Sequence, residues 1–127
     1  MIRQFTNSDY SILKSWWEKH KEPHPTLEYL PESTFILEDN GVPVYSISVI
    51  LTNNPLCYLE YFNSNPDHTE NRKELSQRLF DYAIDFAKSK GHKFVATLAY
   101  REKVKNRVVE LGMQRTFDNL SSFVKEL

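Results

Sequence analysis

One carboxylate interrupts an apolar run in the middle of the chain. Glu60 stands in the segment "LCYLEYF" (residues 56–62), whose other members are apolar or aromatic. A carboxylate among such neighbours needs a partner or a chemical purpose, because burying an unpaired charge is costly. One purpose that suits it is general-base catalysis, in which the carboxylate takes a proton from an incoming nucleophile. A solvent-facing glutamate and a structural ion pair are the two alternatives.

A second candidate site begins a few residues later, in "NRKELSQRLFDYAIDFAKSKG" (residues 71–91). The segment starts with an amide and two cations, Asn71, Arg72 and Lys73, and the N-terminus of a helix attracts anions through its free backbone N–H groups. A competing interpretation is a capping box, in which the side chains of Asn71 and Glu74 each accept a hydrogen bond from the other's backbone N–H. Such a helix end would satisfy its own donors and would be closed to a ligand.

Periodicity and turn signals predict the elements that must position these residues. The helix from about residue 72 to residue 90 carries its apolar side chains at helical spacing, and Asn40-Gly41 is typical of a hairpin between two β-rich runs. The segment "KEPHPTLEYLP" holds three prolines, so it should be a loop with one short helical turn. The other expected elements are strands at residues 2–5, 56–62, 92–99 and 120–127 and helices at residues 10–20 and 100–111.

The predicted order is therefore β-α-β-β-β-α-β-α-β in one domain over residues 1–127. The strand 56–62, the helix after it and the strand 92–99 form a βαβ unit, whose two strands should be parallel and connected in the right-handed sense. The hairpins before that unit are antiparallel. The sequence thus predicts an α/β domain with a mixed, twisted sheet and helices on both faces.

Composition narrows the function classes. Hydrophobic residues make up 40% and charged residues 26% of the chain, and the formal net charge is -1, which offers no overall attraction to nucleic acid. No stretch approaches the roughly 18 apolar residues that a membrane span requires. The lone Cys57 is predicted to be a buried small hydrophobe, and a chain without a disulfide fits the reducing cytoplasm.

This element order, together with the segment "RLFDYAIDFAKSKGHKFV", resembles the GNAT superfamily of acyl-CoA N-acyltransferases over nearly the whole chain. The resemblance implies acetyl-CoA as cosubstrate and a small-molecule or protein amine as acceptor. In the family a loop Gln/Arg-x-x-Gly-x-Gly/Ala holds the pyrophosphate, and the corresponding positions here are Asn71, Glu74 and Ser76. Both glycine positions carry side chains, and the chain's three glycines serve the hairpin and two helix ends. We therefore expect weak acetyl-CoA binding.

The resemblance also implies roles for single residues. Glu60 would act as the base for the amine, and the pantetheine arm would pair with the free strand edge near Tyr61, Phe62 and Asn63. Asn71, Arg72 and Lys73 would contact the phosphates. The family's tyrosine acid on the final helix is replaced by Val108, and Tyr100 at the start of that helix is the nearest candidate for its role.

A non-catalytic binding module that keeps this fold is the competing function class. The missing loop glycines and the missing tyrosine favour it, whereas Glu60 and the element order favour the enzyme. Trp16, Trp17 and Tyr29 are candidates for an acceptor pocket or a partner surface, although tryptophan pairs more often belong to a core. No metal site is predicted, since Pro23 and Pro25 break the helix that would align His20 with His24, and no third ligand is near in the sequence.

Overall fold

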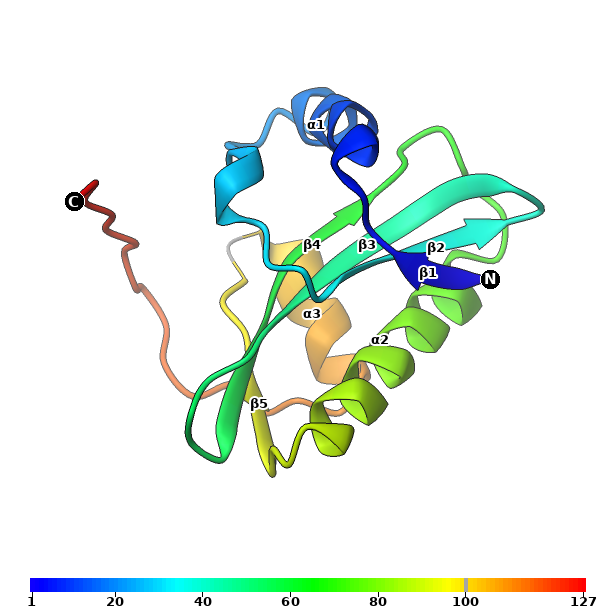
Figure 1. Cartoon of the computed structure of the whole chain (residues 1–127). Coiled ribbons are helices and arrows are strands. Elements are labelled where there is room, and N and C mark those ends of the chain that lie inside the picture. The colour runs from blue at the N-terminus through cyan, green and yellow to red at the C-terminus, as the bar shows by residue number, and fades with distance from the viewer. Residues whose placement is uncertain (100) are drawn as a thin grey trace.

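The computed structural model describes residues 1–99 and 101–127 (Figure 1). Within these described ranges, five strands form one sheet in the order β1-β2-β3-β4-β5, accompanied by three α-helices and two 3-10 turns. The strands are β1 (Ile2–Gln4), β2 (Thr34–Asp39), β3 (Val42–Ile50), β4 (Leu56–Ser64) and β5 (Phe94–Ala96). The helical elements are η1 (Asn7–Asp9), α1 (Tyr10–Lys19), η2 (Leu27–Tyr29), α2 (Arg72–Ser89) and α3 (Glu102–Glu110).

The sheet is mixed, as predicted. Strands β1 to β4 pair antiparallel, and β4 pairs parallel with β5 after the crossover through α2. The Asn40-Gly41 hairpin between β2 and β3 has positive φ angles of 50° and 80°, which are the signs that a tight type I′ turn requires. The predicted α/β class and its βαβ unit are confirmed.

Helices cover both faces of this sheet (Figure 1), and each face has its own apolar cluster. On one face, α2 packs its buried stripe, including Leu75, Leu79 and Ala83, against side chains of β2, β3 and β4. Cys57 belongs to this cluster and is fully buried, as predicted. On the other face, a smaller cluster of Leu13, Trp16, Trp17 and Ile36 attaches α1 to the sheet.

A bulge interrupts the regular alternation of β4. Ser46 of β3 pairs with Asn63, but Ser48 pairs with Glu60, so β4 has one residue more than β3 over this stretch. Tyr61 occupies the bulge with a φ of 55°, a left-handed conformation that is uncommon for a bulky side chain. The extra residue turns Phe62 to the α2 face. Regular alternation along β4 would have placed Phe62 on the same face as Glu60.

The predicted last strand is absent. Residues 114–127 belong to no helix or strand and leave the body of the domain as an extended segment (Figure 1). Its large apolar side chains are exposed, with Phe123 at 91% and Val124 at 78%. Local β propensity suggested a strand here, but a strand also needs a paired edge, and no pairing includes these residues. The predicted strand 92–99 is also shorter, since β5 ends at Ala96.

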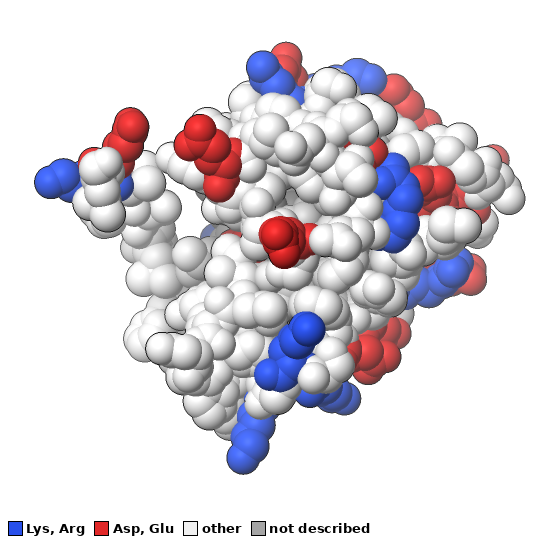
Figure 2. All heavy atoms as spheres, in the orientation of Figure 1, with Lys and Arg blue, Asp and Glu red and all other residues white. Residues whose placement is uncertain are grey.

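The surface carries no dominant charge on the face that Figure 2 shows, where basic and acidic side chains are interspersed. None of the helices in the described part of the chain combines the length and the apolar composition that crossing a membrane would take.

Candidate functional site

The sheet opens between β4 and β5. The two strands pair only through Leu56, Cys57 and Tyr58, although β4 continues to Ser64. Along the described residues, no strand pairs with the outer edge of β4 beyond Tyr58. A free strand edge presents backbone N–H and C=O groups that can bind an extended ligand. The family resemblance implied a free strand edge at this place.

A cavity of about 490 Å³ lies on the α2 side of this opening, between β4, the first turns of α2 and the inner face of α3. Its apolar wall includes Leu59, Phe62 and Phe80. Five cations and two carboxylates also line it: Arg72, Lys73, Arg101, Lys103, Arg107, Glu22 and Glu110. This surplus of cations contrasts with the net charge of -1 of the whole chain, and it favours an anionic ligand.

The first of these cations, Arg72, already donates hydrogen bonds to backbone carbonyl groups. Its Nη1 donates to the carbonyl of His68 at 2.7 Å and to that of Asn65 at 3.3 Å. The guanidinium also stacks 5.6 Å from the ring centroid of Tyr45, whose hydroxyl donates to the Arg72 carbonyl. Arg72 therefore fixes the loop between β4 and α2, whereas Lys73 beside it is exposed.

The N-terminus of α2 is not closed by its own side chains. Asn71 has a left-handed backbone, with φ 54° and ψ 31°, and no side chain of the described residues caps the helix start. The predicted capping box of Asn71 and Glu74 is therefore wrong. A capping side chain needs an extended backbone to reach the N–H groups of the first turn, and the left-handed turn at Asn71 does not provide it.

Arg107 reaches this helix start from the opposite wall. Its Nη2 donates to the hydroxyl of Ser76 at 2.8 Å and to the carbonyl of Lys73 at 2.9 Å, and its Nε lies 3.2 Å from the same hydroxyl. Its Nη1 pairs with Glu110 at 3.0 Å. Sequence reasoning missed Arg107, because a cation one position before Val108 belongs to no recognised motif. The available signal was its place on the predicted final helix.

Glu60 stands where β4 and β5 part. Its Oε1 accepts a hydrogen bond from the backbone N–H of Leu98 at 3.2 Å, just beyond the last paired residues of the two strands. Burial raises the pKa of this carboxyl from 4.5 to about 7, although the bond from Leu98 lowers it. A carboxyl with this pKa can accept a proton near neutral pH. Burial and the charge of Glu60 also raise the pKa of the neighbouring Tyr61.

At the other end, residues from the α1 side of the sheet reach the cavity. His20 Nε2 lies 2.9 Å from the carbonyl oxygen and 3.0 Å from the hydroxyl oxygen of Ser64, at the end of β4. Glu22 pairs with Arg101 Nε at 2.7 Å. All four residues line the cavity, so the cavity extends toward the face that α1 covers.

The structure places four of the eight predicted catalytic and cofactor-binding residues on the wall of this cavity. Phe62, Asn63, Arg72 and Lys73 line it, and so does Val108 at the position of the family's tyrosine. Glu60 lies at the strand edge rather than on the cavity wall, and the exposed Asn71 begins the helix beside it.

Other predicted residues lie elsewhere. Tyr61 packs against the α1 cluster, and Tyr100 lies outside the described residues. Trp16 and Trp17 are each only 3% exposed and belong to the core, whereas Tyr29 is exposed.

No protein-family model matches the sequence, and no curated protein matches it either. Solved structures do match. Among them is N-acetylglutamate synthase from Neisseria gonorrhoeae in complex with coenzyme A and L-arginine, with a TM-score of 0.78 at 20% identity, covering 96% of this chain and 29% of that one. The chain thus spans less than a third of the length of that synthase.

Two further matches span nearly the full length of both chains. A predicted acetyltransferase from Clostridium acetobutylicum with acetyl-CoA has a TM-score of 0.69 at 17% identity, covering 97% of this chain and 95% of that one. A transcriptional regulator from Bacillus halodurans C-125 has a TM-score of 0.73 at 12% identity, covering 98% and 99%. The mixed sheet, its opening beyond Tyr58 and these matches show that the chain has the GNAT fold.

Proposed function

We propose that the protein is an acetyl-CoA-dependent N-acyltransferase that transfers an acyl group to an amine. The observation that carries this proposal is the cavity of about 490 Å³, which combines a surplus of cations with an unpaired strand edge. Cations suit the phosphates of coenzyme A, and a free edge suits the amide groups of its pantetheine arm. The fold agrees, since matched structures of similar architecture contain coenzyme A or acetyl-CoA. The lone, buried Cys57 fits a cytoplasmic protein.

The phosphates would lie near the first turn of α2. Lys73 is exposed there, the backbone N–H groups of the turn have no side-chain cap, and Asn71 exposes its amide at the same end. Arg72 would contribute mainly by holding the loop that shapes the site. The pantetheine arm would run along the outer edge of β4 past Phe62 and Asn63, pairing with backbone groups as an added strand would.

The reaction needs a neutral amine, because only an unprotonated nitrogen can attack. Its lone pair forms a bond to the thioester carbonyl carbon, the C–S bond breaks, and coenzyme A leaves as a thiolate while the amide remains. Glu60, whose pKa is about 7, would take the proton that the amine loses, directly or through a water molecule. A backbone N–H at the open edge would polarise the carbonyl oxygen.

The acceptor amine would approach from the α1 side of the sheet. Glu60 lies at the opening between β4 and β5 rather than on the cavity wall. Its carboxylate is therefore near the place where the α1 face and the α2 face of the sheet connect. The leaving thiolate would take its proton from water, because Val108 on the cavity wall has no proton to give.

That same Val108 is the observation that favours the second candidate, a non-catalytic module that binds a ligand or partner through this cavity. A matched structure of nearly the same length is called a transcriptional regulator. The two candidates differ in turnover, since the module would bind without releasing free thiol.

The test has two parts, a binding measurement and a turnover measurement. Calorimetry should detect acetyl-CoA binding, and a ligand present at a hundred times its dissociation constant should raise stability by about 2.7 kcal/mol. Thiol release should then be followed over a panel of polyamines, amino acids, aminoglycosides and peptides, with Glu60→Gln as the matched control. Binding without thiol release on any acceptor would favour the module. Absence of both binding and release at millimolar acetyl-CoA would overturn the proposal.

A further inference from the structure

We infer that Arg107 is the principal phosphate-binding side chain of the cavity and that Ser76 positions it. This inference rests on the proposed function and extends it to a residue outside the cofactor loop. The loop that follows β4 offers no glycine for close backbone approach to a phosphate. The guanidinium of Arg107 reaches the same place from the opposite wall of the cavity.

Ser76 shows how the guanidinium is held. It is only 3% exposed, and its hydroxyl donates to the Lys73 carbonyl at 3.1 Å. The oxygen of that hydroxyl then accepts from both Nε and Nη2 of Arg107, at 3.2 Å and 2.8 Å. Nη2 also donates to the Lys73 carbonyl. These contacts fix one side of the planar guanidinium against α2 and direct its remaining Nη1 group away from that helix.

Nη1 is the group that a phosphate oxygen would engage. It pairs with Glu110 at 3.0 Å, but the Glu110 side chain is 52% exposed, and an ion pair of this kind contributes little stability. A phosphate can therefore replace the glutamate at small cost. Arginine suits this role because its donors are arranged in a rigid fork that matches phosphate oxygens.

The geometry predicts opposite effects on phosphate binding for two side-chain substitutions, neither of which lies in the loop between β4 and α2. Glu110→Gln should tighten the binding of a phosphate-bearing ligand, since a competing carboxylate disappears. Ser76→Gly should weaken it, although glycine is the residue that the family's loop would carry at this position. A loop that worked by close backbone approach would respond to Ser76→Gly in the other direction.

Calorimetry with coenzyme A, inorganic pyrophosphate and pantetheine, which lacks phosphate, tests the inference. Arg107→Ala should weaken coenzyme A and pyrophosphate about ten- to a hundredfold, as expected for a hydrogen bond to a charged group, and should leave pantetheine unchanged. Arg107→Lys should recover part of the loss. The control is Lys105→Ala, which removes a cation from the same helix that does not line the cavity, and which should change none of the three affinities.

Unchanged coenzyme A affinity in Arg107→Ala would overturn the inference, as would an equal loss of pantetheine, which would show that Arg107 only supports the cavity. If Arg107→Ala does not fold, Arg107→Lys and Glu110→Gln decide in its place: unchanged affinity for pyrophosphate in both variants would refute a phosphate contact. Wild-type protein that binds pyrophosphate but not coenzyme A would keep the Arg107 site and refute the proposed function. Wild-type protein that binds neither would overturn both.

Discussion

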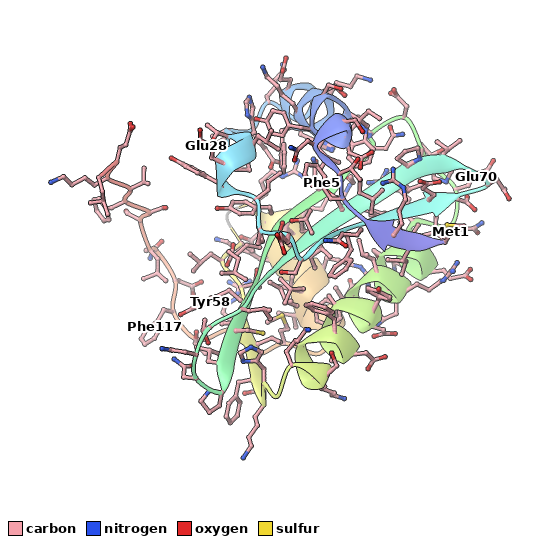
Figure 3. The ribbon with its side chains drawn as sticks, in the orientation of Figure 1. Met1, Phe5, Glu28, Tyr58, Glu70 and Phe117 are labelled. Carbon is pink, nitrogen blue, oxygen red and sulfur yellow. The ribbon has the colours of Figure 1, made fainter. Side chains whose placement is uncertain are left out.

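The Glu60 carboxylate accepts a hydrogen bond of 3.2 Å from the backbone N–H of Leu98, which links β4 to the segment just beyond β5, where the two strands cease to pair. Figure 3 shows the side chain of Tyr58, the last residue of β4 that pairs with β5, on the lower part of that strand. Among the described residues, the half-buried carboxylate has this one donor, which is fewer than its two oxygens can accept. Its second oxygen is therefore available for a proton or an amine.

The ionisation of Glu60 should make the rate of acyl transfer depend on pH. Since Glu60 must be ionised to act as a base, and its pKa is about 7, kcat/KM should fall as the pH is lowered through about 7. Glu60→Gln should lower turnover by roughly 10²- to 10⁴-fold and remove that part of the pH profile, while acetyl-CoA affinity stays nearly unchanged. Steady-state rates between pH 5.5 and 9 check this. A variant with full activity would show that Glu60 is structural.

The same carboxyl should make folding stability depend on pH. Its pKa in the folded protein, about 7, lies above the ordinary value of 4.5, so ionisation is less favourable in the folded state. Below the ordinary pKa value, the carboxyl is protonated in both the folded and the unfolded state, so its burial does not reduce folding stability. Wild-type stability should therefore decrease as the pH rises from about 4.5 to about 7, and Glu60→Gln should lack this decrease. Urea unfolding measures it, with the exposed Glu18→Gln as control.

Asp9 should respond to pH in the opposite direction. Hydrogen bonds from Arg3 lower the pKa of this carboxyl to about 2, and Thr6 adds a backbone bond. The stabilisation is complete above the ordinary value of 3.8 and should be lost as the pH falls toward 2. At neutral pH, Asp9→Asn should cost roughly 2 kcal/mol, because it leaves a charged donor without its acceptor.

A matched control for Asp9 exists on the surface. Asp67 pairs with Lys19 at 2.9 Å, but its side chain is 73% exposed. Asp67→Asn should therefore change the free energy of unfolding by less than about 1 kcal/mol. Equal losses in the two variants would mean that burial of the Arg3–Asp9 pair has no energetic importance.

Those parts of the fold that local chemistry determines could be predicted from the sequence. The Asn40-Gly41 hairpin, the stripe of α2 and the βαβ crossover each depend on residues close together in the chain, and each is present. The bulge at Tyr61 could not be predicted, since it reflects the register between two strands.

The candidate site shows the same division. The segment that begins α2 could be recognised, but the contact of Arg107 with Ser76 joins residues 31 positions apart and has no local signature. The capping prediction failed for a related reason. Residue types fitted a capping box, while the backbone angle at Asn71, which the preceding loop sets, did not.

The C-terminal segment should contribute little to the stability of the folded domain. Phe123 is 91% exposed and Leu120 is 63% exposed, and neither belongs to an apolar cluster. Removing residues 119–127 should therefore change the free energy of unfolding by no more than about 0.5 kcal/mol. Thermal melting of the truncated chain checks this, together with an untruncated Phe123→Ser variant as control. A large loss on truncation would mean that the segment packs as the predicted strand after all.

Substitutions of Asn71 distinguish a left-handed backbone turn from a side-chain cap at the start of α2. Its φ of 54° is a left-handed conformation, which asparagine tolerates and glycine adopts freely, while other residues lose about 1–2 kcal/mol there. Asn71→Gly should therefore leave stability nearly unchanged, and Asn71→Ser should cost about 1 kcal/mol. A capping side chain would give a different result, because serine caps a helix about as well as asparagine and its substitution would be almost neutral. Urea unfolding of both variants distinguishes these outcomes. Coenzyme A titration of Asn71→Gly adds a second readout: unchanged affinity would show that the Asn71 amide does not contact the phosphates, whereas weaker binding at unchanged stability would make Asn71 a ligand of the cofactor.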